Sequence, residues 1–249
     1  MTAHAQLEIG GFTIVNATSA ELAAHLHAQR FLGKQATIFF ANTNFVVQCS
    51  GLRERMNQPG IVVANDGVGM DIAARLMQGE RFRDNLNGTD FMPFLFRQSP
   101  APLRVFLLGG KPDIVRRAAR HAAQQLSQIV VGTCDGYRGL ATRRNLVDAI
   151  NRAQPDVLLV ALGNPAQEKW ILDYRAHLNV PIVAGVGALF DFWAGDKPRA
   201  PRAVQKLRLE WFYRLCLEPR RLARRYTVDI FRFLKYCHQH RPHRPQPDA

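Results

Sequence analysis

Short apolar runs alternate with longer amphipathic segments along most of the chain. The runs end at Gly, Pro, Asn or Asp, which is typical of parallel strands buried on both faces. They predict strands at residues 36–40, 61–64, 103–109, 129–132, 156–162 and 181–186. The segments between them have helical periodicity and predict helices at residues 19–29, 71–77, 112–126, 142–153 and 165–178.

This alternation predicts an α/β fold, a Rossmann-like and mostly parallel sheet covered by helices. In such a sheet the ligand lies in a crevice at the carboxyl ends of the strands. Polar or glycine-rich turns follow the predicted strands at residues 42–44, 65–69, 109–110, 132–136, 163–165 and 185–188. We therefore expect a rim that binds a ligand with phosphates or hydroxyls.

The charge lies mainly at the end of the chain. The 249 residues carry a formal net charge of +13, and residues 197–249 hold 14 basic and 4 acidic side chains, a net charge of +10. Apolar residues recur there at helical spacing between arginines, which predicts two basic amphipathic helices. Such helices lie on an anionic membrane or on nucleic acid, or else cap the core with a solvated face.

Three parts of the chain are therefore expected. Residues 1–196 form the α/β core, and residues 197–237 form a basic helical C-terminal appendage. Residues 238–249, rich in His, Pro and Arg, form a disordered tail.

Several protein classes are disfavoured by what the sequence lacks. The four cysteines form no CxxC pair, so neither a disulfide framework nor a zinc ribbon is predicted. No apolar run reaches about 18 residues and the N-terminus lacks the regions of a signal peptide, so we expect a protein that neither spans a membrane nor is secreted. We also find no D-x-D pair, no H-E-x-x-H spacing and no complete dinucleotide fingerprint.

Two acidic residues on the predicted rim are candidates for chemistry. Asp66 follows the strand at 61–64 directly and precedes two glycines, so its carboxylate would lie at the crevice and could deprotonate a sugar hydroxyl. Its alternative role is to form a turn or cap a helix. Asp191 is a second acid of the rim, with a loop cap as its alternative.

Polar and basic residues could complete the site. Gln167 falls in the first turn of a predicted helix, near the positive end of the helix dipole, although ordinary helix-compatible polarity also explains it. Arg199 lies in a proline-punctuated basic segment at 196–202. Because a guanidinium binds phosphate bidentately, such a segment over a glycine-lined crevice suits a diphosphate without a metal.

These segments occur in one order along the chain. They are Asn-Thr-Asn at 42–44, Asn-Asp-Gly-Val-Gly at 65–69, Leu-Asn-Gly-Thr-Asp at 86–90, Leu-Leu-Gly-Gly at 107–110, Asn-Pro-Ala-Gln-Glu-Lys-Trp at 164–170, Gly-Val-Gly-Ala-Leu-Phe-Asp at 185–191, Arg-Ala-Pro at 199–201, Leu-Glu-Trp-Phe-Tyr-Arg at 209–214 and Glu-Pro-Arg-Arg-Leu at 218–222. Together they resemble the WecG/TagA/CpsF family of bacterial glycosyltransferases, over roughly residues 7–236.

The resemblance implies an inverting transfer of a sugar from a UDP-sugar to a polyprenyl-diphosphate-linked sugar, without metal or cofactor. Asp66 would be the catalytic base and Gln167 an active-site amide. The resemblance also implies binding residues at Asn42, Thr43, Asn44, Gly109, Gly136, Gly187, Asp191, Arg199, Arg214, Arg220 and Arg224. The enzyme would be peripheral on the cytoplasmic face of the inner membrane, where the appendage docks on the anionic surface and closes the site with arginines.

The chain departs from the family pattern at two places. Members often have Thr-x-Asn where this chain has Asn42, Thr43 and Asn44, so Asn42 or Thr43 would take the role of the threonine. Asn85 stands where many members have an arginine, for which Arg81 or Arg83 could substitute.

The donor sugar and the function class both have alternatives. The segments around residues 42–45 and 87–91 look most like the GumM branch, which implies transfer of glucose in a β-1,4 linkage during exopolysaccharide synthesis. The alternative donors are UDP-N-acetylmannosamine and its uronic acid. Two rivals from other classes are a nucleic-acid-binding module that uses the basic tail, and a nicotinamide-dependent oxidoreductase.

Overall fold

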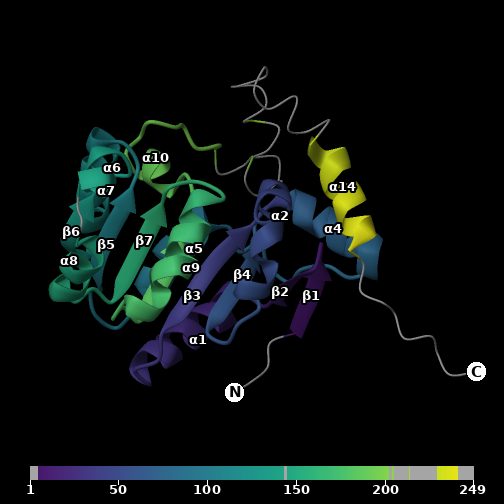
Figure 1. Ribbon diagram of the computed structural model, residues 1–249, viewed down its shortest axis with the longest axis horizontal. Helices are drawn as coiled ribbons and strands as arrows, with labels where there is room; N and C mark the ends of the chain where they lie inside the picture. The colour runs from purple at the N-terminus through teal and green to yellow at the C-terminus, as the bar shows by residue number, and fades with distance from the viewer. Residues whose placement is uncertain (1–4, 143–144, 202–203, 205–212, 214–228, 241–249) are drawn as a thin grey trace, which may run out of the picture.

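A computed structural model shows one eight-stranded sheet with helices on both faces (Figure 1). The structure describes residues 5–142, 145–201, 204, 213 and 229–240. The strand order is β1-β2-β4-β3-β8-β7-β5-β6, and β1 alone among these strands is antiparallel to its neighbour. The predicted α/β fold with a Rossmann-like, mostly parallel sheet is confirmed.

The strands are β1 (Ala5–Ile9), β2 (Phe12–Asn16), β3 (Ala36–Ala41), β4 (Ile61–Asn65), β5 (Arg104–Gly109), β6 (Ile129–Cys134), β7 (Val157–Ala161) and β8 (Ile182–Gly185). The α-helices are α1 (Ser19–Phe31), α2 (Thr43–Gln48), α3 (Arg53–Met56), α4 (Val68–Gln78), α5 (Gly88–Gln98), α6 (Pro112–Gln124), α7 (Arg138–Thr142), α8 (Leu146–Ala153), α9 (Ala166–Tyr174), α10 (Leu189–Trp193) and α14 (Ile230–Gln239). Short 3₁₀ turns lie at Ser50–Leu52 and Arg175–His177.

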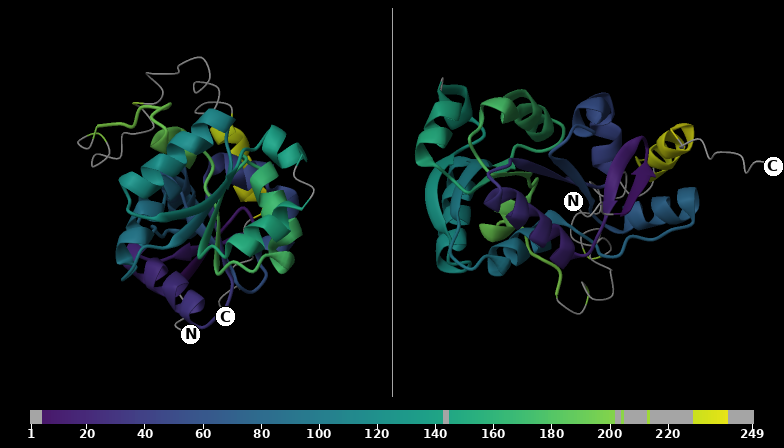
Figure 2. Two further views of the ribbon diagram at one scale, coloured as in Figure 1. Left: turned by 90° about the vertical axis from the view of Figure 1, so that its left-hand side faces the viewer. Right: turned by 90° about the horizontal axis from the view of Figure 1, so that it is seen from below.

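Each face of the sheet packs against its own group of helices (Figure 2). Side chains of a strand alternate between the faces, so Ile38 of β3 lies in one buried cluster and its neighbour Phe39 in the other. One cluster is completed by α1, α5, α6 and α10, and the other by α2, α4, α8, α9 and α14. The result is a three-layer sandwich.

The carboxyl ends of seven strands, β2 to β8, lie along one edge of the sheet because these strands are parallel. Strand β3 lies between β4, the next strand along the chain, and β8, the last strand of the sheet. The chain therefore continues from β3 toward one side of the sheet, while the strand on its other side comes much later in the sequence. Such a switch point is where α/β sheets of this kind bind their ligands. The turns after β4, β3, β8 and β7 therefore flank a natural ligand crevice.

Helix α14 returns from the C-terminal region to the β1 end of the sheet, at the right of Figure 1. Phe233 and Cys237 are fully buried in the same cluster as residues of α2 and α4. Tyr236 lies beneath Arg53, whose guanidinium carbon is 5.9 Å from the ring centroid. This helix therefore packs one face against the core and spans Ile230–Gln239.

All six predicted strands and the five helices predicted between them are present, with shifted ends. The first of the two basic helices expected after residue 197 lies outside the described residues, apart from positions 204 and 213. The helix expected at 71–77 begins at Val68, and the one expected at 142–153 begins at Leu146. The structure adds the β1–β2 hairpin and helices α2, α3, α5, α7 and α10, which the apolar pattern did not predict. The three-part division of the chain stays a prediction.

Candidate functional site

Asp66 lies at the end of β4, next to the first residue after β3. Its backbone N–H donates to the carbonyl of Ala41 (2.8 Å), which holds the two strand ends together. The Asn42 amide Nδ2 donates to the Asp66 carboxylate at 3.4 Å, and the side chain of Asp66 is half-buried. The predicted catalytic carboxylate is therefore at the switch point of the sheet.

Asn42 also fixes the start of helix α2. Its Oδ1 accepts hydrogen bonds from the backbone N–H groups of Asn44 and Phe45, both at 3.1 Å, so the side chain is a helix N-cap. Thr43 instead packs against Gly69. A Cβ added at Gly69 would lie only 2.4 Å from the methyl carbon of Thr43. Of the two residues expected to replace the family threonine, Asn42 is the one that contacts Asp66.

The turn after Asp66 is held by Asn85. Its Oδ1 accepts from the backbone N–H of Gly67 at 2.8 Å. Arg83 pairs instead with Glu21 at 2.7 Å, and this glutamate also closes the capping box of α1 with Thr18. Arg81 is exposed. The residue that stands in place of the family arginine is thus itself part of the site.

Gln167 lies in the first turn of α9, the helix that follows β7. Its side chain is 3% exposed and bridges two elements. Its Oε1 accepts from the backbone N–H of Gly187 (3.0 Å), in the turn after β8, and its Nε2 donates to Glu168 (2.7 Å). Two residues predicted for the site, Gln167 and Gly187, therefore contact each other.

Glu168 is fully buried beneath this turn. Its Oε1 accepts hydrogen bonds from Asn164 Nδ2 (2.6 Å) and Gln167 Nε2 (2.7 Å), and the thiol of Cys49 is a further neighbour. Burial raises the pKa of the Glu168 carboxyl, although these hydrogen bonds oppose the rise. Burial, then the charge of Glu168, raises the pKa of Cys49. The residues predicted for the site from the sequence include Gln167 but not this glutamate beside it.

Gly109 is the last residue of β5, and Gly136 lies just beyond the end of β6. A Cβ at Gly109 would stand 2.2 Å from the carbonyl oxygen of Ala161, and the residue has a φ of +122°, so only glycine fits there. The N–H of Gly136 donates to the carbonyl of Gly110 at 2.9 Å. The two glycines thus bring the turns after β5, β6 and β7 into close contact.

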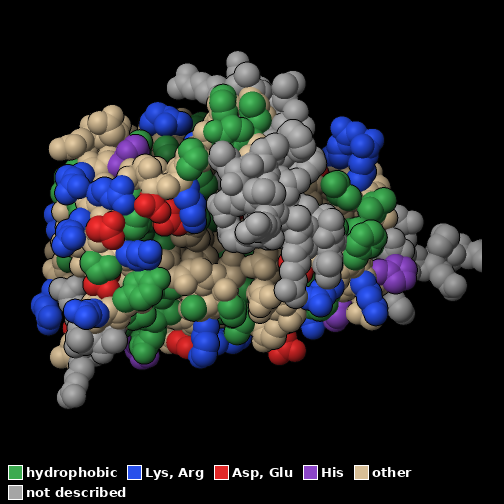
Figure 3. Space-filling model, turned by 90° about the horizontal axis from the view of Figure 1, so that it is seen from above, with side chains coloured by type: hydrophobic (Ala, Val, Ile, Leu, Met, Phe, Trp, Pro, Cys, Tyr) green, Lys and Arg blue, Asp and Glu red, His purple; other side chains and the backbone are tan. Residues whose placement is uncertain are grey.

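A cavity of about 410 Å³ adjoins the end of β6 and is lined by Pro112, Val115, Arg116, Thr133, Cys134, Asp135 and Gly139. Asp135 caps the following turn by accepting from the N–H groups of Tyr137 (3.0 Å) and Gly139 (3.1 Å). Burial alone would raise the pKa of Asp135, but the backbone hydrogen bonds from Gly139 and Tyr137 outweigh it and lower the pKa. Lys and Arg side chains are frequent over this end of the molecule, at the left of Figure 3.

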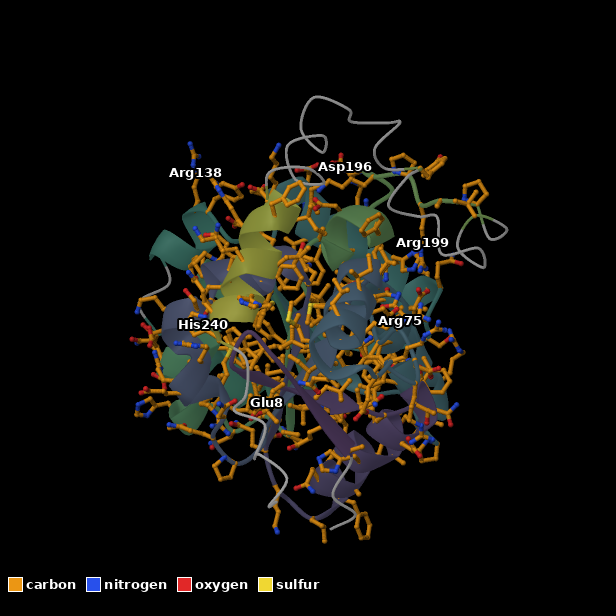
Figure 4. The ribbon with its side chains drawn as sticks, turned by 90° about the vertical axis from the view of Figure 1, so that its right-hand side faces the viewer. Glu8, Arg75, Arg138, Asp196, Arg199 and His240 are labelled. Atoms are coloured by element: carbon orange, nitrogen blue, oxygen red, sulfur yellow. The ribbon has the colours of Figure 1, made fainter. Side chains whose placement is uncertain are left out.

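Two further predicted residues form ion pairs, one in α10 and one on the segment after it. Asp191 pairs with Lys197 at 3.0 Å. Arg199, labelled in Figure 4, pairs with Asp90 in the first turn of α5. In this structure the Arg199 guanidinium thus has a carboxylate partner, where the sequence predicted a diphosphate. Arg214, Arg220 and Arg224 lie outside the described residues.

Neither a metal-binding cluster nor a membrane-spanning helix occurs among the described residues. They contain no group of three or more His, Cys, Asp or Glu side chains that could hold a metal ion. They also contain no helix that is both long and apolar enough to cross a bilayer.

The arrangement unites a carboxylate, two glycine-rich turns and several amide side chains at one sheet edge. Asp66 can accept a proton, while backbone N–H groups and the positive end of α9 can face an anionic ligand. The arrangement can therefore support proton transfer beside an anionic ligand.

The model of the Glycosyl transferase WecG/TagA/CpsF family matches residues 7–246. The chain therefore belongs to this family of glycosyltransferases, as its motifs predicted.

Two similar proteins share one name, N-acetylglucosaminyldiphosphoundecaprenol N-acetyl-beta-D-mannosaminyltransferase. The protein from Bacillus subtilis (strain 168) is 34% identical over 168 residues, which cover 67% of this chain and 64% of the relative. The protein from Staphylococcus aureus (strain NCTC 8325 / PS 47) is 27% identical over 237 residues, which cover 92% of this chain and 91% of the relative.

Proposed function

We propose that the protein transfers N-acetylmannosamine from UDP-N-acetylmannosamine to a polyprenyl-diphosphate-linked N-acetylglucosamine, with inversion at the anomeric carbon. The observation that carries the reaction type is the half-buried carboxylate of Asp66 beside Asn42 at the switch point, in a chain of this glycosyltransferase family. The choice of sugars rests on the activity for which the two relatives are named.

Asp66 acts as the general base in this proposal. An acceptor hydroxyl oxygen forms a bond to the anomeric carbon, and the bond from that carbon to the diphosphate oxygen breaks. The hydroxyl proton goes to the Asp66 carboxylate, and UDP leaves with the bonding electrons. Asn42 holds the carboxylate in place, since it is itself fixed by capping α2.

The leaving diphosphate requires positive partial charge. In this proposal the positive end of the α9 dipole faces the diphosphate, and Arg199 would add a full charge once released from Asp90. Charge stabilisation of this kind needs no metal ion. The arginines at 214, 220 and 224 are proposed to serve the same leaving group.

The donor in this proposal is the alternative of the sequence interpretation, not its first choice. The motifs around residues 42–45 and 87–91 favoured the GumM branch and glucose, whereas the relatives named above are N-acetylmannosaminyltransferases. We keep the peripheral position on the cytoplasmic face of the inner membrane as part of the proposal, because the acceptor is linked to a polyprenyl lipid.

The test offers full-length protein a panel of radiolabelled UDP-sugars with two acceptors, N-acetylglucosaminyl-diphosphoprenol and glucosyl-diphosphoprenol. We expect label from UDP-N-acetylmannosamine in a lipid-soluble disaccharide made from the first acceptor. Transfer of glucose to the second acceptor alone would return the protein to the GumM-like branch. Assays in excess EDTA should retain activity, and loss of activity that Mg²⁺ restores would contradict the metal-free mechanism.

A further inference from the structure

Glu168 is a buried acid that has no cationic partner among the residues the structure describes. Its residue is 0% exposed, and within the described part of the chain it forms an ion pair with no Lys, Arg or His. Its hydrogen-bond donors, the amides of Asn164 and Gln167, are neutral. Its Oε2 is buried and accepts no hydrogen bond from a described residue's nitrogen or oxygen.

Stability does not explain a carboxyl group at this position. Burial of an acid without a cation disfavours its charged form, which is why its pKa is raised. A glutamine has nearly the same size and an oxygen that could accept from both amides without this penalty. Strained or costly groups of this kind gather at functional sites.

The carboxyl group of Glu168 determines the orientation of the Gln167 side-chain amide. The N–H of Gly187 can only donate, so it selects the oxygen of the amide, and the carboxyl Oε1 of Glu168 selects the nitrogen. The second hydrogen on Gln167 Nε2 is used by neither bond. Glu168 therefore orients the amide and, through it, the turn after β8 at Gly187.

The carboxyl group of Glu168 also lies beside helix α2, which follows β3. Cys49, whose thiol is beside Glu168, is the C-cap of helix α2. The N-cap of that helix is Asn42, which contacts Asp66. Glu168 thus contacts elements on both sides of the switch point, α9 after β7 and α2 after β3.

We propose that Glu168 is a positioning residue of the transferase, whose buried carboxyl group holds the Gln167 amide in its working orientation and so sets the rate of sugar transfer. The inference rests on the proposed function, because it assigns Glu168 a part in that reaction through Gln167. It gives Glu168 no contact with substrate.

The experiment is a double-mutant cycle in the full-length protein, measured by the transfer assay. Glu168→Met removes both acceptor oxygens at similar length, and Gln167→Ala removes the amide. Each single change should lower kcat about 10²-fold, the effect of losing one oriented donor, and should alter the KM for the donor sugar by less than about threefold. In the Gln167→Ala background, Glu168→Met should change kcat by less than about twofold, because its effect passes through that amide.

Two further variants separate positioning from folding. Glu168→Gln keeps an acceptor oxygen and the size of the side chain, so it should restore kcat to within about tenfold of the wild type. Asp173→Asn removes an exposed acid from the same helix, where it pairs with Lys169 and Arg55, and should leave kcat unchanged. Melting temperatures are recorded for all variants.

Three results would overturn the proposal. The first is wild-type kcat in Glu168→Met, and the second is an equal effect of that change with and without Gln167. The third is a fall in kcat that follows loss of folded protein in both Glu168 variants. If the wild type itself transfers no sugar to either acceptor, the proposed function fails and this inference falls with it, whereas an active wild type with an indifferent Glu168 removes this inference alone.

Discussion

Asp66 and Glu168 contact the two ends of one short helix, α2, and their surroundings suit them to different tasks. Asp66 is half-buried and faces Asn42 at the N-terminal end, so it can meet a substrate hydroxyl. Glu168 is fully buried near Cys49 at the C-terminal end, so it can act only through its protein neighbours. The same functional group therefore serves as a base in one place and as a support in the other.

Replacement of Asp66 by asparagine tests the base directly. Asp66→Asn keeps the shape of the side chain but cannot accept the proton, so kcat should fall by about 10²- to 10⁴-fold while the melting temperature stays within a few degrees of the wild type. Steady-state transfer kinetics measure the effect. Asp113→Asn, an exposed acid on α6 paired with Arg117, is the matched control. Near-normal turnover by a folded Asp66→Asn protein would remove Asp66 from the role.

The raised pKa of Glu168 predicts how stability depends on pH. The folded protein holds this proton more tightly than the unfolded chain, whose carboxyl has the ordinary value of 4.5. The wild type therefore loses stability as the pH rises from about 4.5 through the raised pKa, and Glu168→Gln does not. At neutral pH the variant should unfold at a higher denaturant concentration than the wild type, and the difference should shrink toward pH 4.5. A constant difference across this range would contradict the assigned pKa shift.

At the scale of elements, α14 joins the basic C-terminal region to the core. Phe233 is fully buried against α2 and α4, whereas Phe231 on the same helix is 71% exposed. Phe233→Ala should lower the free energy of unfolding by about 3–5 kcal/mol, because it leaves a cavity between three helices. Phe231→Ala should change it by less than about 0.5 kcal/mol. Urea titrations followed by circular dichroism measure both, and equal effects would mean that α14 does not pack as described.

The central strands and helices were predictable because their signals are local. Strands such as β7 are continuous apolar runs bounded by polar turns, and α1 begins with the capping box of Thr18 and Glu21. Helix α5 was missed because Pro93 lies inside it and disrupts the helical pattern. The β1–β2 hairpin did carry a signal, since the pair Gly10 and Gly11 separates two alternating segments.

The site was predictable in part for a similar reason. Asp66, Gln167 and Gly187 follow strands, and parallel strands bring their carboxyl ends together, so their common location could be inferred. The roles of Glu168 and Asn85 depend on contacts between segments far apart in the chain. Spacing along the sequence does not encode that Glu168 meets Cys49, or that Asn85 holds the N–H of Gly67. Those contacts required coordinates.

At the scale of the whole molecule, the net charge of +13 predicts attraction to anionic surfaces. Truncation after Gly195 is the obvious test of the basic region, but it would also remove Phe233 and Cys237 from the core. Point changes on the exposed face of α14 avoid this. Arg232 and Lys235 are exposed there, while the buried face of the helix stays intact.

Two double variants, each lacking two positive charges, test whether the position of the charge or only the net charge governs membrane binding. Arg232→Gln with Lys235→Gln should weaken binding to vesicles of anionic lipid at least about tenfold, because each basic residue near such a surface contributes about 1 kcal/mol. Arg97→Gln with Arg120→Gln removes the same charge from α5 and α6 and should have a much smaller effect. Co-sedimentation at 0.1 M and 1 M salt measures binding to the vesicles. Binding should be abolished at 1 M salt, because the Debye length is shorter there.

Equal weakening by both pairs would mean that net charge, and not a membrane-facing α14, governs the attraction. Binding to DNA that is as strong as binding to vesicles would revive the nucleic-acid alternative.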